Sequence, residues 1–137
     1  MLPIIIRRDL SGRNATNWPG LVILGRGAPM PAAVLAQEVW ESRWKMNPLN
    51  LAARLMSDSA RRDMEIMGHE VEVQAAVLIY GADEDATRAR EASAMLRGYD
   101  GLFNGFSRAG LILAMLGQRS AARTWVERNK RLLSRYR

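Results

Sequence analysis

Val34-Leu35-Ala36-Gln37-Glu38-Val39-Trp40-Glu41, residues 34–41, is the stretch that decides the fold prediction. Its apolar residues recur with helical spacing, and the predicted helix runs from about residue 31 to 45. Upstream, β-branched runs over residues 3–8 and 21–24 predict two strands, and the polar residues 11–17 predict a loop between them. The sequence therefore predicts a short β unit that leads directly into a helix with polar side chains on one face.

The remainder of the chain is predicted to be helical. Asn47 followed by Pro48 is typical of a helix start, and Gly81 is typical of a helix end. We expect helices over about residues 48–56, 57–80, 83–97, 107–116 and 119–137, with an aromatic, glycine-containing loop over 98–106. The prediction is an α+β fold, mostly α, in which short N-terminal β-strands precede about five or six helices. The length of 137 residues predicts one domain, residues 1–137.

Composition excludes several classes of site. The chain has no cysteine, so disulfides, Cys-zinc ribbons and thiol nucleophiles are excluded. No apolar run approaches the roughly 18 to 20 residues of a membrane helix, and the apolar run over residues 2–6 is too short for a signal peptide. We therefore expect a protein without a membrane span that is cytoplasmic at synthesis.

Residues 37–41 have the form of the zinc-peptidase motif H-E-x-x-H with both histidines replaced, by Gln37 and Glu41. In the intact motif the two histidines lie on one helical face and bind zinc, while the glutamate is the general base. Here Glu38 occupies the position of that base. An ordinary polar helix face is the competing interpretation of these three residues.

A second polar stripe is predicted on the helix over residues 57–80. At 100° per residue Glu65, His69 and Glu72 fall on one side, with apolar positions on both flanks. His69 is either a hydrogen-bonded core histidine or a metal ligand. Acidic side chains on two facing helices would repel each other unless a proton, a metal or a basic side chain joined them.

Residues 20–80, and above all residues 34–41 and 62–74, resemble small zincin-like proteins of the gluzincin type that tailed bacteriophages encode. The resemblance implies a zincin-like N-terminal half with a degenerate H-E-x-x-H motif. In an enzyme it would make Glu38 catalytic and Glu65 the third ligand, or alternatively Glu72. A remodelled metal site would then use Glu41, Glu65 and His69.

The last predicted helix, residues 119–137, is basic and amphipathic. It holds seven basic side chains and one acidic side chain, which equals the net charge of +6 of the whole chain. Its apolar stripe includes Trp125 and Tyr136 and predicts packing on the domain or on a partner. Its other face predicts contact with phosphates or with acidic subunits, or simple solvation, and carries Arg123, Arg128, Arg131 and Arg135.

The sequence as a whole favours a non-catalytic structural or interaction protein that works with other protein subunits, as in a phage virion. No cofactor is expected on this interpretation, because the histidine ligands are missing. A metal-dependent hydrolase with zinc or another divalent metal is the first alternative. A protein that contacts nucleic acid through residues 119–137 is the second.

Overall fold

The computed structural model describes residues 2–137 and has three strands, six α-helices and one 3-10 turn in that range. The prediction of a mostly helical α+β fold is confirmed. The elements, in chain order, are β1 (Ile4–Arg8), β2 (Ala15–Trp18), β3 (Leu21–Gly25), α1 (Pro31–Lys45), α2 (Pro48–Met56), α3 (Asp58–Tyr80), α4 (Glu84–Arg97), η1 (Tyr99–Gly101), α5 (Arg108–Gly117) and α6 (Arg119–Ser134).

The three strands form one sheet in the order β1-β3-β2, in which β1 runs parallel and β2 antiparallel to β3. The prediction of a loop over residues 11–17 was wrong at its end, because β2 begins at Ala15. The sequence pattern missed this strand because only one of its two inward positions, Ala15, is apolar, and the other is Asn17. Asn17 faces polar side chains of α1 instead of a hydrophobic core.

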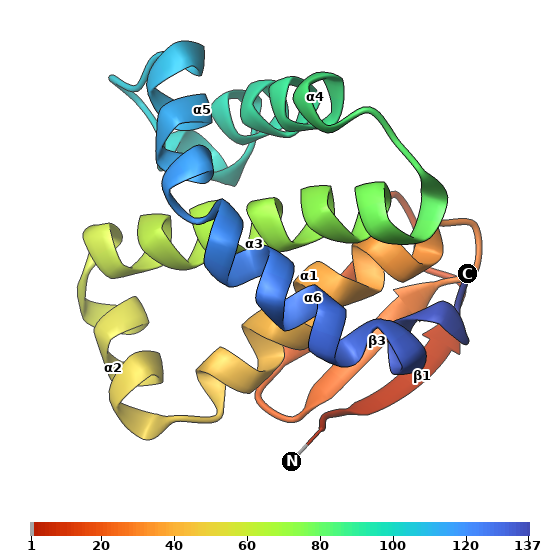
Figure 1. Cartoon of the computed structure of the whole chain (residues 1–137). Helices are drawn as coiled ribbons and strands as arrows, with labels where there is room; N and C mark the ends of the chain where they lie inside the picture. The colour runs from red at the N-terminus through yellow and green to blue at the C-terminus, as the bar shows by residue number, and fades with distance from the viewer. Residues whose placement is uncertain (1) are drawn as a thin grey trace.

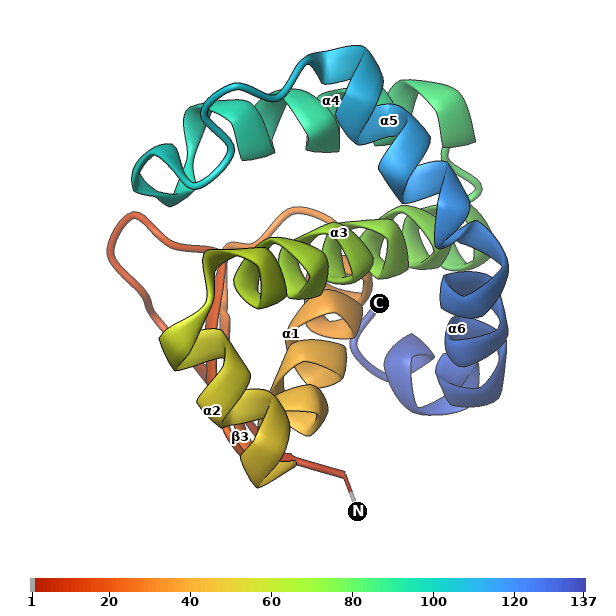
Figure 2. The same cartoon turned by 90° about the vertical axis from the view of Figure 1, so that its left-hand side faces the viewer.

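Helix α1 covers one face of the sheet. Three alanines of its first two turns, Ala32, Ala33 and Ala36, are almost completely buried, and their small side chains let α1 lie close to its neighbours. Figure 2 shows the strands on one side of α1 and α6 on the other. α1 is thus enclosed, and its polar residues can be buried only where other polar groups meet them.

Helix α3 runs through the middle of the molecule and separates two hydrophobic cores (Figure 1). Val71, Ala75 and Ile79 face the core shared with α1, α6 and the sheet. Ile66 and Val73 face the core shared with α4 and α5. No helix over residues 2–137 combines the length and the apolar character needed to cross a membrane.

A buried ion-pair network fixes α4 to α3. Arg88 donates two hydrogen bonds of 2.7 Å each to the carboxylate of Glu70, and both side chains are inaccessible to solvent. Glu84 accepts from Arg88 at 2.6 Å and from Arg119 of α6 at 2.6 and 3.0 Å. The hydrogen bonds from Arg119, followed by those from Arg88, lower the pKa of Glu84 to about 2.

The outer face of the sheet is apolar and uncovered. Ile4, Leu21 and Trp18 lie side by side across the three strands, as do Ile6 and Ile23 in the next row. Ile4 is 68% exposed and Trp18 is 50% exposed.

Candidate functional site

The polar stripes of α1 and α3 face one another across a shared groove. One part of the groove, about 470 Å³, is lined by Glu41 and Glu65 among others, and the adjoining part, about 390 Å³, by His69 and Glu72. Glu38 lines both parts. The residues that the sequence singled out on the two helices are therefore brought to one place.

Gly68 makes this close approach of the two helices possible. A Cβ atom on Gly68 would lie 2.6 Å from Glu41 Oε1 and 3.3 Å from Gln37 Cγ. A side chain at this position would push Glu41 aside. Positions 37 and 41, which correspond to the ligand histidines of the intact motif, therefore rest directly on the α3 backbone.

Helix α1 carries the degenerate motif and is called the motif helix below. Its polar side chains form hydrogen bonds with one another and with β2. Gln37 Nε2 donates to Glu41 Oε1 at 3.1 Å, and Asn17 Nδ2 donates to Glu41 Oε2 at 3.0 Å. Asn17 also donates to Glu38, and its own carbonyl oxygen accepts from Lys45 Nζ at 2.7 Å. The motif helix and β2 thus form a hydrogen-bond network in which two amides donate to the two carboxylates and the Lys45 ammonium donates to one of these amides.

Burial controls the protonation of this network. It raises the pKa of Glu41 well above its usual value, and the neighbouring carboxylates of Glu65 and Glu38 raise it further. Burial also raises the pKa of Glu38 and lowers the pKa of Lys45. Burial thus disfavours the charged forms of Glu38, Glu41 and Lys45, and hydrogen bonds stabilise these side chains inside the protein.

The second part of the groove contains a His/Glu triad. Ligand atoms of His69, Glu72 and Glu91 lie within 4.8 Å of one another, and no other such group of three His, Cys, Asp or Glu side chains occurs over residues 2–137. His69 Nδ1 lies 2.6 Å from Glu91 Oε2, and Nε2 lies 2.5 Å from the hydroxyl of Tyr99. One imidazole and two carboxylates make a donor set that suits a divalent metal.

The two carboxyl groups of the triad also interact with each other. Burial raises the pKa of Glu72 well above its usual value, and the hydrogen bond and charge of Glu91 raise it further. Burial likewise raises the pKa of Glu91. The hydrogen bond between the two carboxyl groups requires a proton on one of them, and a cation could take the place of that proton. Burial also raises the pKa of Tyr99, so that its hydroxyl stays protonated beside His69.

The predicted metal set of Glu41, Glu65 and His69 is not one group of neighbouring ligand atoms over the described residues, and Glu72 belongs to the triad instead. Glu65 lies beside Glu41 at the motif helix. Glu91, the third member of the triad, was missed because it comes from α4, 19 positions after Glu72, where the sequence has no motif around it. Only the packing of α4 on α3 brings it to His69.

Backbone strain occurs at the mouth of the groove. Tyr99 and Asp100 have φ angles of 60° and 51°, in the left-handed region that non-glycine residues seldom adopt. Both line the part of the groove next to Glu41 and Glu65. The strained turn holds the Tyr99 hydroxyl against His69, and this is a position where strained residues are often functional.

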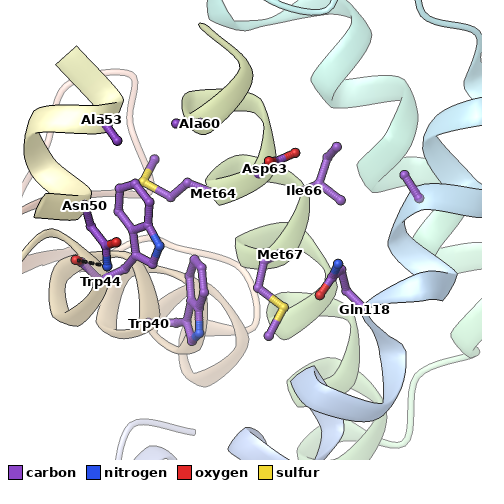
Figure 3. A pocket seen from close by; sticks show the side chains of 11 residues that line it. Trp40, Trp44, Asn50, Ala53, Ala60, Asp63, Met64, Ile66, Met67 and Gln118 are labelled. Carbon is purple, nitrogen blue, oxygen red and sulfur yellow. Dashed lines mark hydrogen bonds between the residues drawn. The ribbon is translucent and has the colours of Figure 1, made fainter. Parts of the chain in front are cut away.

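A separate, more apolar cavity of about 710 Å³ lies on the other flank of α3. Figure 3 shows Trp40 and Trp44 of α1 facing Met64 and Met67 of α3 across it. Asn50 closes one end by donating to the carbonyl oxygen of Trp44 at 3.1 Å. Trp40 and Trp44 thus lie next to each other on one face of α1 and line the cavity, and Trp40 also packs against the core.

Helix α6 uses its apolar face within the domain. Ala122, Val126 and Leu133 are buried against the core of α1 and α3, and Trp125 and Tyr136 pack at its margin. The free surface of α6 is its basic face. Arg123 lies 3.3 Å from Glu127, whereas no carboxylate over residues 2–137 comes within 4.0 Å of the other three predicted contact residues, Arg128, Arg131 and Arg135.

Comparisons with known proteins do not assign this chain to a family. No protein-family model, no curated protein and no solved structure matches it significantly. The resemblance to zincin-like phage proteins therefore stays a prediction from the residues.

Proposed function

We propose that this protein is a non-catalytic structural or interaction protein built on a degenerate zincin-like arrangement. The observation that carries the proposal is the network at the motif helix. Gln37 and Asn17 both donate to the carboxylate of Glu41, and Lys45 donates to Asn17. The residues at the two histidine positions of the motif thus form hydrogen bonds with other side chains of the chain, which supports a role without a bound metal.

The uncovered sheet face supports the interaction part of this proposal. Monomeric proteins seldom leave a contiguous apolar patch on the surface without using it for contact. Trp18 is the residue on this face best suited to anchor a partner, because buried Trp side chains dominate binding energies at interfaces. The partner subunit in this proposal is a second copy of this chain. Incorporation into a tailed-phage particle is the part of the proposal that follows from the sequence resemblance.

Sedimentation analysis of a double variant tests the interaction part. Ile4→Ser with Trp18→Ser removes the two most exposed side chains of the outer row, and the matched control is Leu49→Ser on α2, where Leu49 is 80% exposed. The proposal expects concentration-dependent self-association of the wild type that the double variant loses and the control keeps. A wild type that stays monomeric up to high concentration would contradict it.

A metal-dependent hydrolase is the second candidate function, and the His/Glu triad favours it. His69, Glu72 and Glu91 would hold a divalent metal such as zinc, with Tyr99 orienting the imidazole from its second nitrogen. A bound metal would act as a Lewis acid on a carbonyl group. Glu38 lines the same part of the groove and would accept a proton from an attacking water.

Glu91→Gln separates the two candidates. The triad would lose a metal ligand, so metal binding measured by calorimetry should fall by an order of magnitude or more if the metal site exists. Glu65→Gln is the matched control, because Glu65 lies in the other part of the groove. Equal, negligible metal binding by both variants and by the wild type would leave the interaction protein as the sole proposal.

A further inference from the structure

Three arginines line the part of the groove that also contains Glu41 and Glu65, and each arginine comes from a different element. Arg13 belongs to the loop between β1 and β2, Arg54 to α2 and Arg61 to α3. Over residues 2–137 no carboxylate oxygen lies within 4.0 Å of any of these three guanidinium groups. Three unpaired cations from three segments of the chain thus meet around one cavity of about 470 Å³.

Two of these arginines carry an unsatisfied donor. Over the described residues, Arg54 Nε and Arg61 Nε are the two buried side-chain polar atoms without a hydrogen-bond partner. Leaving a buried donor unpaired costs about 1–3 kcal/mol, and native proteins rarely tolerate it. Both arginines line one cavity, so their orphan donors indicate that an acceptor is missing beside it.

Four carboxyl groups also line this cavity, those of Glu38, Glu41, Glu65 and Asp100, but over residues 2–137 none of them lies within 4.0 Å of the three guanidinium groups. Asn17 donates to both Glu38 and Glu41, and Gln37 donates to Glu41. The arginines therefore need an acceptor that the chain does not supply.

The arrangement of the arginines favours a phosphate over a carboxylate. One guanidinium group satisfies a planar carboxylate with two parallel hydrogen bonds. A phosphate group has three or more oxygens that point in different directions, and donors from several elements suit it better. The strained Tyr99–Asp100 turn also lines this cavity.

We propose that Arg13, Arg54 and Arg61 form a binding site for a phosphate group at the mouth of this groove. The group belongs either to a small phosphorylated ligand or to the end of a nucleic acid strand. The site goes beyond the interaction role proposed above and does not depend on it, because no metal and no subunit contact takes part.

Calorimetry with inorganic phosphate and with a short DNA strand, with and without a 5′-phosphate, tests the proposal at constant ionic strength. The test variant is Arg54→Gln with Arg61→Gln, and the matched control is Arg43→Gln, because Arg43 is exposed on α1 and lines no part of the groove. Because Arg54 and Arg61 are partly buried, Arg13→Gln serves as a second variant at an exposed position.

We expect the double variant to bind at least about tenfold more weakly, because it loses two charged donors and a single charge-assisted hydrogen bond already corresponds to about that factor. The control should bind like the wild type. Arg13→Gln should weaken binding without lowering the melting temperature. Binding of inorganic phosphate identifies a small ligand, and binding of only the 5′-phosphorylated strand identifies a nucleic acid end. No binding of either probe, or equal binding by the variants and the control, overturns the proposal.

Discussion

Replacing Glu70 by Gln should destabilise the protein strongly, because Glu70 is the buried partner of Arg88. The side chain of Glu70 is fully buried and that of Arg88 is 2% exposed, and two hydrogen bonds of 2.7 Å join them. Removing one partner of a buried pair costs about 3–5 kcal/mol, since the remaining charge is left in a dry environment. Glu84 also accepts from Arg88, so we expect the lower end of this range.

Chemical denaturation measures the free energy of unfolding of Glu70→Gln against the wild type. At roughly 3–4 °C per kcal/mol for a domain of this size, the melting temperature should fall by about 10 °C. Arg88 precedes Glu91 by one turn of α4, so the ring resonances of His69 should change as well. A double variant, Glu70→Leu with Arg88→Met, should regain much of the loss, because no buried charge remains. A loss under about 1 kcal/mol in Glu70→Gln would refute the reasoning.

Three further predictions concern acid stability, the motif and the basic helix. The folded pKa of Glu84, about 2, is below its ordinary value of 4.5, so the stability it contributes is present above about pH 4.5 and is lost as the pH falls towards 2; Arg119→Gln should flatten that part of the stability curve, and an unchanged curve would contradict the ion pair. The double substitution Gln37→His with Glu41→His restores the motif and should create a zinc site together with Glu65, so that zinc raises the melting temperature of the variant. If zinc raises it no more than in the wild type, the two helices do not have zincin geometry. Replacing the basic face of α6 by Gln should leave folding intact and lower the log-log salt slope of any DNA binding by about 0.9 per lost phosphate contact, and failure of the wild type to bind DNA at low salt would remove this function. The substituted residues are Arg123, Arg128, Arg131 and Arg135.

The sequence predicted helices best where their ends carry capping residues. Asn47 accepts from Leu49 N at 3.0 Å, and Gly81 ends α3 with a left-handed φ of 68°, as expected from the residue types. Strand β2 was missed because a short edge strand whose inward residues are Ala15 and Asn17 has no clear hydrophobic alternation. Asn17 points inward because it donates a hydrogen bond to Glu41 of α1, and a contact between distant residues leaves no local sequence pattern.

The candidate site was predicted on two of its helices and missed on the third. Glu65, His69 and Glu72 share a stripe because the helical period of α3 dictates it, and residues of α1 face them. Glu91 could not be found in this way, because its place beside His69 depends on how α4 packs on α3. Tyr99 was noted only as part of an aromatic loop, since its contact with His69 requires a strained backbone.

Metal analysis of the purified wild type, combined with melting curves with and without chelator, tests the central claim most directly. If the motif residues only form hydrogen bonds with other side chains, the protein should contain well under one equivalent of zinc, and chelator should leave its melting temperature nearly unchanged. Stoichiometric metal that is lost on chelation together with several degrees of thermal stability would contradict the account and favour the metal-dependent hydrolase.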